Sequence, residues 1–441
     1  MTMSTRFAVV LGAGLGMLCA SLAGVPEASA QAAALKVDSG DTAWVLMSSA
    51  LVLVMLVPGL ALFYGGLVRS KNVLGTIMQS FIILSVVSLL WIVIGYSLAF
   101  GPDKGGVIGG LDWVGLSGVG AEPHPVYGPT VPHQAFMFFQ MMFAAITPAL
   151  IAGAFAERKR FSAMVIFSAL WSLFVYVPLA HWIWGGGWLA KMGALDFAGG
   201  AVVHISSGAA ALVCAIVLGK RRGYGTDYMA PHNLPMTLLG TGLLWFGWFG
   251  FNGGSALGAN GVAISAILAT HTAASMGAVV WCIAEWMHRG KPTVLGVASG
   301  AVAGLATVTP ASGYIGPFSA LLIGAAAGLA CYFAIVWKGR FGYDDSLDVV
   351  GIHGVGGVLG ILATGLFASK AINSGGADGL LYGNPAFFGV QVLTVVVVAV
   401  FSAVVTFLLL KLVDGMTKLR IEPEAEATGL DLSQHNERAY S

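Results

Sequence analysis

The sequence predicts an all-α protein that crosses a membrane about eleven times. Of its 441 residues, 57% are hydrophobic and 9% are charged, and the mean hydropathy is +0.85. Soluble domains carry about 25% charged residues, so most of this chain must face lipid or the inside of a helical bundle. The formal net charge of +1 gives no indication of a nucleic-acid partner.

The second observation is a series of long apolar runs separated by short polar connections. Each run is long enough to cross a hydrocarbon core of about 30 Å as a helix, and strands of a membrane barrel would show about ten residues of alternating polarity instead. We expect spans at residues 43–67, 76–100, 133–155, 161–183, 197–219, 235–254, 261–287, 293–310, 313–337, 347–368 and 386–413.

Residues 1–30 have the pattern of a signal peptide. Arg6 supplies a positive charge, an apolar stretch runs from Phe7 to about Ala23, and Ala28-Ser29-Ala30 forms a small-residue cleavage site. We expect cleavage before Gln31, with the mature N-terminus outside the cytoplasm; the alternative is an uncleaved first span. The membrane domain then comprises residues 31–413.

The positive charges of the connections predict the orientation. Twelve Lys and Arg residues follow the odd-numbered spans and three follow the even-numbered ones. Because cytoplasmic loops are enriched in Lys and Arg, the odd spans should end in the cytoplasm, which again places the N-terminus outside. Residues 414–441 turn polar and should form a cytoplasmic tail, and the protein should lie in the inner (plasma) membrane.

Two matching segments indicate an internal repeat. Asp196 precedes His204 by eight residues in the fifth span, and Asp345 precedes His353 by the same spacing at the tenth. Five spans per half is an odd number, so the repeats at about 43–219 and 235–368 should be inverted, with a last helix at 386–413. Inverted repeats commonly place a transport site at their interface near the membrane midplane.

Ionisable groups at membrane depth are costly and by default mark a path for ions or protons. A structural interpretation stays open, in which Asp196 caps its helix and the two histidines brace their helices. Two neutral imidazoles in contact can instead share a proton and line a narrow path. A zinc site is a weaker alternative because two ligands fall short of the usual three or four.

Several glycines have the small-xxx-small spacing that lets membrane helices pack closely. The pairs are Gly300/Gly304, Gly324/Gly328 and Gly356/Gly360. The four cysteines show no paired spacing, so the sequence indicates neither a disulfide framework nor a metal motif.

Four longer motifs resemble the ammonium transporter family (Amt/Mep/Rh), and in particular its bacterial Amt branch. They fall in the expected order over nearly the whole mature chain. The motifs are Leu62-Phe63-Tyr64-Gly65-Gly66-Leu67, Asp196-Phe197-Ala198-Gly199-Gly200 through His204, Trp245 to Ser255, and Gly351-Ile352-His353-Gly354.

The resemblance assigns roles to residues that are otherwise simple core or interfacial groups. It makes His204 and His353 the twin histidines of the pore, and it places Trp184, Phe139 and Ser255 in a vestibule that recruits ammonium. Aromatic faces attract small cations with about 0.5–2 kcal/mol.

The same resemblance makes Phe143 and Phe251 a stacked pair that closes the pore, and Gln140 and Tyr64 further pore positions. Asp196 is either a helix cap or an anion that favours cation entry and deprotonation, and both roles are compatible.

The resemblance implies a transporter that takes up ammonium, removes its proton and conducts ammonia, with separate proton transfer making transport electrogenic. The alternatives are an electroneutral ammonia or carbon dioxide channel of the Rh type and an ammonium sensor acting through its tail. We expect no enzyme activity and no cofactor or metal. The family further implies a homotrimer in membrane lipid and a PII-type signal protein bound to the tail.

Overall fold

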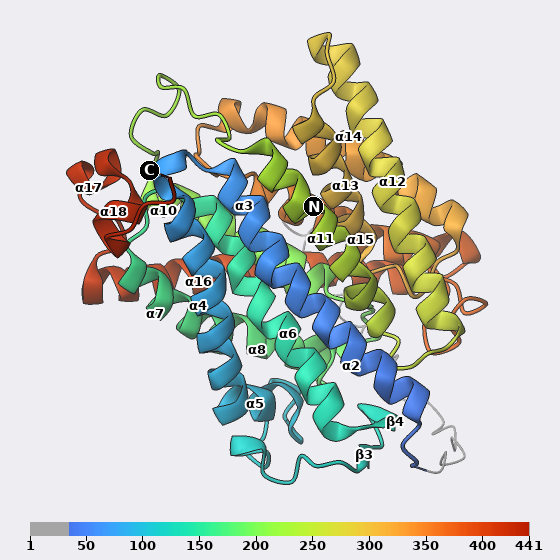
Figure 1. Cartoon of the computed structure of the whole chain (residues 1–441). Coiled ribbons are helices and arrows are strands. Elements are labelled where there is room, and N and C mark those ends of the chain that lie inside the picture. Colours follow the sequence, from blue (N-terminus) through green and yellow to red (C-terminus); the bar gives the residue numbers. More distant parts are fainter. Residues whose placement is uncertain (1–34, 441) are drawn as a thin grey trace, which may run out of the picture. The chain divides into compact units, whose positions relative to one another are not determined.

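The computed structural model describes residues 35–440, and within that range the chain is predominantly helical (Figure 1). Ten helices are long and apolar enough to cross a membrane. They span Ser39–Leu67, Ser70–Phe100, His133–Phe155, Phe161–Lys191, Gly200–Leu218, Leu234–Gly254, Gly261–Arg289, Pro317–Phe341, Val350–Phe367 and Pro385–Thr417. With the shorter apolar helix Val294–Val308, this confirms an all-α membrane protein with about eleven apolar helices. The predicted signal peptide lies outside the described residues.

The first half of the chain is built from helices that contain three-residue to six-residue π and 3₁₀ segments. Its α-helices are α2 (Ser39–Val54), α3 (Ala61–Leu67), α4 (Val73–Leu90), α5 (Tyr96–Phe100), α6 (His133–Ile151), α7 (Phe161–Trp171), α8 (Val177–Ile183), α9 (Trp188–Lys191) and α10 (Ser206–Leu218). The π segments are Met55–Leu60, Trp91–Gly95, Ser172–Tyr176 and Gly200–Ile205, and the 3₁₀ segments are Ser70–Asn72, Val114–Leu116 and Ala152–Phe155.

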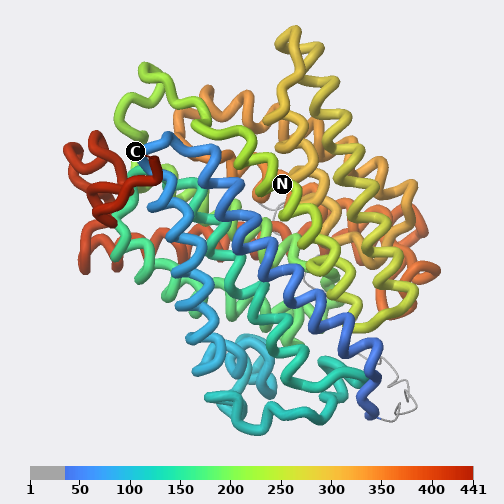
Figure 2. The backbone as a smooth tube through the Cα atoms, in the orientation of Figure 1, coloured from blue at the N-terminus to red at the C-terminus, as the bar shows by residue number. Residues whose placement is uncertain are grey.

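The second half continues with longer helices and packs directly against the first. Its elements are α11 (Leu234–Gly254), α12 (Gly261–Arg289), α13 (Val294–Val308), α14 (Pro317–Phe341), a π segment at Val350–Gly354, α15 (Val355–Phe367), a 3₁₀ segment at Leu380–Tyr382, and α16 (Pro385–Thr417). In Figures 1 and 2 α11 runs beside α2, although the two are far apart in the sequence.

Local sequence signals fix where several of these helices begin. Asn233, Asn260, Thr293 and Asn384 each precede a helix, and each side chain accepts a hydrogen bond from a backbone N–H of the first turn. Such side chains satisfy amide groups that have no partner within the helix. Proline occupies the first positions of α11, α14 and α16, where its missing N–H costs nothing.

The boundaries of two predicted spans need correction. The span expected at 293–310 is only the 15-residue α13, which at 1.5 Å per residue is about 22 Å long and falls short of the hydrocarbon core. The last helix was expected to end at residue 413 but continues to Thr417. The apolar run at 293–310 extends past the helix because its last residues form a buried turn rather than a helical end.

The connection between the second and third spans contains two small antiparallel hairpins. β1 (Asp103–Lys104) pairs with β2 (Ile108–Gly109), and β3 (Pro123–His124) pairs with β4 (Gly128–Pro132). Strands this short leave too little alternation to be recognised in a sequence. The hairpins precede α6 and help to position its first turn, where the backbone N–H of His133 donates to Glu122 O at 3.0 Å.

The predicted glycine pairs lie where helices approach one another closely. A Cβ atom at Gly304 would lie 2.2 Å from Ala273 O, and one at Gly324 would lie 2.5 Å from the same oxygen. A Cβ at Gly360 would lie 2.2 Å from Thr307 O. Side chains larger than hydrogen are therefore excluded at these crossings, which confirms that the pairs are structural.

The polar tail is folded rather than extended. It forms α17 (Pro423–Thr428) and α18 (Leu430–His435), and α18 contacts the first turn of α4 and the residue before it. The backbone N–H of Gly75 donates to Asp431 Oδ1 at 2.8 Å, and the backbone N–H of Leu430 donates to Asn72 Oδ1 at 2.8 Å. The sequence indicated only a polar segment here, because Asn72 and Gly75, which bind it, lie more than three hundred residues earlier.

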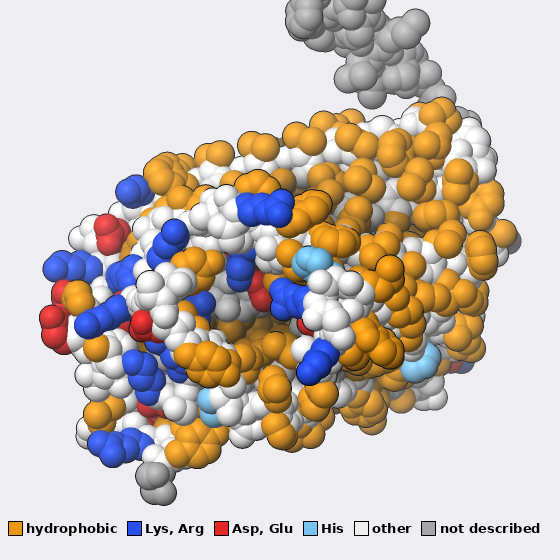
Figure 3. Space-filling view, turned by 90° about the horizontal axis from the view of Figure 1, so that it is seen from above, with side chains coloured by type: hydrophobic (Ala, Val, Ile, Leu, Met, Phe, Trp, Pro, Cys, Tyr) orange, Lys and Arg blue, Asp and Glu red, His pale blue; other side chains and the backbone are white. Residues whose placement is uncertain are grey.

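Charged side chains gather at the end of the molecule that carries this tail (Figure 3). Four connections meet there in a buried ion cluster. Glu157 accepts from Arg69 and Arg221, and Arg221 also donates to Asp344. The paired guanidinium groups hold the pKa values of Glu157 and Asp344 below their ordinary values, although burial alone would raise them. Arg69 and Arg221 of this cluster are two of the twelve positive charges that follow the odd-numbered spans in the sequence.

Candidate functional site

The two histidine-bearing segments share one plan. Each begins with a buried aspartate, continues through a π-helical segment that contains the histidine, and ends in a 13-residue α-helix. A π segment widens the helix by one residue per turn and is frequently found at functional sites. The internal repeat seen in the sequence is therefore also a repeat of backbone structure.

His204 and His353 contact each other in the interior. Their Nδ1 atoms are 3.1 Å apart, the ring centroids are 5.1 Å apart, and the rings lie at 22° to each other. A hydrogen bond between two Nδ1 atoms requires one to donate and the other to accept, so two neutral rings must adopt different tautomers. His204 Nε2 is buried and has no hydrogen-bond partner within residues 35–440.

The two segments cross where their backbones touch. A Cβ atom at Gly208 would lie 2.2 Å from Gly354 Cα, four residues after His204 and one after His353. The aspartates lie at opposite ends of this crossing: Asp196 adjoins Trp184, whereas Asp345 adjoins Lys338. This antiparallel meeting of equivalent segments agrees with the predicted inverted repeats.

Asp196 is a helix cap in this structure. Its Oδ1 accepts from the backbone N–H groups of Gly199 and Gly200 at 2.8 and 2.6 Å, and its Oδ2 accepts from Ala201 and Val202 at 2.7 and 3.0 Å. These four donors are the amides at the start of the helix that have no partner within it. The carboxylate thus stabilises the π segment that carries His204.

A cavity of about 490 Å³ opens beside the start of this segment. We call it the Trp184 cavity. Trp184 and Ser255 border it, as does Gln140, whose buried Oε1 has no partner in the described part of the chain. The indole Nε1 of Trp184 donates to Asp196 O at 2.7 Å, and Ser255 Oγ donates to Phe251 O at 2.8 Å. The ring and the hydroxyl are therefore held in fixed positions.

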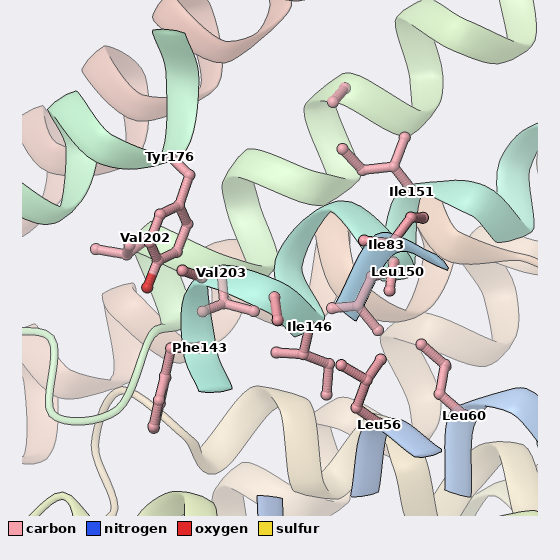
Figure 4. Packing of buried hydrophobic residues seen from close by; sticks show 14 of the residues in the cluster. Leu56, Leu60, Ile83, Phe143, Ile146, Leu150, Ile151, Tyr176, Val202 and Val203 are labelled. Carbon is pink, nitrogen blue, oxygen red and sulfur yellow. The ribbon is translucent and has the colours of Figure 1, made fainter. Parts of the chain in front are cut away.

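Stacked aromatic rings lead from the Trp184 cavity to the histidines. Phe143 borders the cavity and meets Trp184 edge to face at 6.0 Å. Phe143 also stacks on Phe251, with ring centroids 4.2 Å apart and an angle of 28°. Phe251 in turn lies 6.3 Å from the ring of His204. Figure 4 shows Phe143, Ile146 and Leu150 of α6 among the buried hydrophobic side chains of the core, which also include Val202 and Val203.

A second, smaller cavity of about 50 Å³ lies beyond the histidine pair. We call it the His353 cavity, and Tyr64 and Asp348 also border it. Lys338 donates to the carboxylate of Asp348 and, at 2.7 Å, to Asp345 O. Asp345 is fully buried; its Oδ2 accepts from the backbone N–H of Val350 at 2.7 Å, and burial raises the pKa of its carboxyl to about 6.

A continuous series of rings thus leads from the Trp184 cavity to the His353 cavity, in the order Trp184, Phe143, Phe251, His204 and His353. Phe139 lies differently from the expectation. It is fully buried, packs edge to face on Phe143 at 5.0 Å, and is not among the described residues that border the Trp184 cavity.

Sequence reasoning missed other residues around these cavities. Phe136 borders the Trp184 cavity one helical turn before Phe139, and helical periodicity offered a signal for it. Tyr127 and Tyr314 border the same cavity from connections, where no periodicity exists. Trp248 stacks on His204 with centroids 5.7 Å apart, a contact that nothing in its local sequence indicates.

Comparisons with known proteins identify the family of this chain. The family model described as "Ammonium Transporter Family" matches residues 43–440. The chain is 53% identical over 402 residues to the ammonium transporter of Bacillus subtilis, covering 91% of this chain and 98% of that protein.

Two solved structures have a similar fold. Candida albicans Mep2 has a TM-score of 0.83 at 36% identity, covering 88% of this chain and 87% of that one. A chain described as "Sensor Amt Protein" has a TM-score of 0.81 at 30% identity, covering 90% and 98%. This protein belongs to the ammonium transporter family and is a multi-pass membrane protein.

Proposed function

We propose that this transporter captures ammonium in the Trp184 cavity, removes its proton, and conducts ammonia past Phe143 and Phe251 toward the His353 cavity. The proton crosses separately through His204 and His353, so that transport is electrogenic. The observation that carries this proposal is the 3.1 Å contact between the two imidazole Nδ1 atoms at the end of an aromatic column.

Capture is supported by the groups at the Trp184 cavity. The indole face of Trp184 attracts a small cation with about 0.5–2 kcal/mol, and Ser255 Oγ retains lone pairs that can accept an N–H after donating to Phe251 O. Gln140 Oε1 offers a further buried acceptor. Phe139 contributes indirectly in this proposal, by holding the ring of Phe143 in position.

Selectivity follows from the cost of moving an ion through an apolar passage. Phe143 and Phe251 stack face to face and offer no polar group to replace the hydration shell of a cation. Placing a charge at membrane depth costs about 2.5–3.5 kcal/mol or more. Ammonium avoids this cost by leaving its proton behind, which potassium cannot do.

The histidine pair is suited to proton transfer. One Nδ1 donates to the other, so a proton arriving on one ring can leave from its partner after a change of tautomer. The free Nε2 of His204 supplies an entry point. The histidines thereby provide a route for the proton alongside the route for ammonia.

Asp196 acts on the cation through its charge and its position. Both carboxylate oxygens are occupied by backbone donors, so the aspartate stabilises positive charge near Trp184 electrostatically rather than by accepting the proton itself. Its backbone oxygen also orients the indole ring that binds ammonium.

The test is a current measurement in proteoliposomes. Wild-type protein should give a current with ammonium and none with potassium, and His204→Ala/His353→Ala should lose the ammonium current or its selectivity. Val203→Ala, beside His204 but without an ionisable group, serves as the matched control. An unchanged, potassium-excluding ammonium current in the double variant would overturn the relay.

The competing mechanism within the family is electroneutral passage of ammonia or carbon dioxide. It predicts uptake without current in the same experiment. An ammonium sensor is a further alternative, because a solved structure described as a sensor shares this fold. A sensor predicts tight ammonium binding without net uptake, which a flux assay distinguishes.

We further propose that the protein is a homotrimer of the inner membrane, with residues 1–30 removed as a signal peptide and the C-terminal helices in the cytoplasm. The docked tail is a suitable surface for a PII-type signal protein, since α17 accepts hydrogen bonds from Lys71 and α18 is bonded to Asn72 and Gly75. Co-purification with a PII protein under nitrogen-replete conditions tests this partner, and persistent absence of association counts against it.

A further inference from the structure

A third cavity lies beside the histidine pair but outside the path described above. It has a volume of about 340 Å³ and lies between α10, α15 and α16. Its lining consists of apolar side chains and glycines. These residues are Ile205, Gly208, Ala209, Leu212, Val350, Gly354, Val355, Val358, Leu359 and Ala399.

The position of this cavity determines which solvent can fill it. Its walls belong to three helices that span the membrane, and Ala399 lies near the middle of α16. A water molecule needs two to four polar partners to occupy a buried site, and none of the lining side chains has a polar atom. An empty void would forfeit the dispersion contacts of its lining. Hydrocarbon is therefore the occupant that the surroundings supply.

The cavity reaches the lipid-facing surface through its outer lining residues. The partly exposed ones include Ala209 and Leu212 on α10, Val355, Val358 and Leu359 on α15, and Ala399 on α16. Ile205 and Gly208, by contrast, lie at the buried inner end, next to the residues that hold the histidines. The shape is thus a pocket that opens to the bilayer and ends at the crossing of Gly208 and Gly354.

We propose that this pocket binds the hydrocarbon tail of a membrane phospholipid, with the headgroup remaining outside. The lining offers no partner for a phosphate or an amine, so recognition is by burial of methylene groups, at about 0.8 kcal/mol each. The bound chain lies against the backbones of Gly208 and Gly354 and forms the outer support of the segments that carry His204 and His353.

The test uses phospholipid vesicles that contain a phosphatidylcholine with a diazirine in the middle of one acyl chain. After irradiation, adducts on residues 205–212 and 350–359 should exceed those at the lipid-exposed positions Leu89 and Val93 of α4 by about tenfold. Ala209→Phe, which fills the pocket from α10, should abolish that excess.

Ala399→Phe fills the same pocket from α16 and provides a second variant if the first does not fold. Ile216→Phe is the matched control, because it adds the same ring to the exposed face of α10 outside the pocket, and it should leave the labelling unchanged. Labelling of the pocket no denser than at Leu89 and Val93, or insensitive to both filling variants, would overturn the proposal. Cross-links from the pocket to a second copy of the chain would overturn it too.

Discussion

The segments beginning at Asp196 and Asp345 repeat one plan, yet their aspartates are held in different ways. Asp196 places both oxygens on four backbone N–H groups. Asp345 has one backbone donor on Oδ2, and its buried Oδ1 has no partner in the described part of the chain. Lys338 lies close to the second aspartate and binds its backbone oxygen.

This difference shows that equivalent positions in a repeat can have different structural roles. The first aspartate is fully used in capping the π segment and orienting Trp184. The second is a buried acid with spare hydrogen-bonding capacity. The glycines at the crossing differ as well, since Gly208 is enclosed by the partner backbone whereas Gly354 has room for a methyl group.

The largest loss of stability should come from a substitution where the two histidine-bearing segments cross, at Gly208 and Gly354. A Cβ atom at Gly208 would lie 2.2 Å from Gly354 Cα, so Gly208→Ala must push the two backbones apart, at a cost of about 3 kcal/mol. A Cβ atom at Gly354 would lie 3.5 Å from its nearest neighbour, Gly208 Cα, so Gly354→Ala should be tolerated. Thermal unfolding in detergent, followed by size-exclusion fluorescence, compares the two; equal losses of Tm would contradict the asymmetry.

The next largest difference in stability should appear between substitutions of the two aspartates, Asp196 and Asp345. Asp196→Asn replaces an acceptor oxygen by an NH₂ group that faces backbone donors, and we expect a loss of about 2–3 kcal/mol. Asp345→Asn can keep its single bond from Val350 through the remaining carbonyl oxygen and should cost far less. The same thermal unfolding assay compares the two variants. A smaller loss of Tm for Asp196→Asn than for Asp345→Asn would show that the four backbone donors to Asp196 do not stabilise the segment that carries His204.

The smallest effect concerns pH. Because the folded-state pKa of Asp345 is about 6, above the ordinary value near 3.9, the folded protein binds more protons than the unfolded one between these values. The contribution of Asp345 to stability is therefore fully present below about pH 4 and is lost as the pH rises through about 6. The Tm of wild type minus that of Asp345→Asn should fall across this range, and a constant difference would contradict the raised pKa.

Much of the fold could be predicted because it follows from local patterns. Long apolar runs located the membrane helices, and the spacing of Asp and His revealed the repeat. The sequence predicted that the two histidine-bearing segments meet, but not which atoms are in contact, since His204 and His353 are 149 positions apart.

The remaining features depend on three-dimensional packing. Phe136 rather than Phe139 borders the Trp184 cavity, and its spacing of four and seven residues from Gln140 and Phe143 was the available signal. Apolar periodicity alone does not select a face here, because α6 is buried on most of its surface. Nothing near Asp431 in the sequence indicates Gly75, which donates to it. The four donors to Asp196 follow from a π-helical start that the residue types do not specify.

The central claim is that ammonium is split before it crosses, with ammonia and the proton both reaching the other side. The most direct test measures charge movement on a solid-supported membrane and nitrogen uptake in the same proteoliposomes, with ammonium and with potassium. The account predicts one charge moved for each ammonium taken up, no potassium current, and loss of this coupling in His204→Ala/His353→Ala. Nitrogen uptake without charge movement would contradict it.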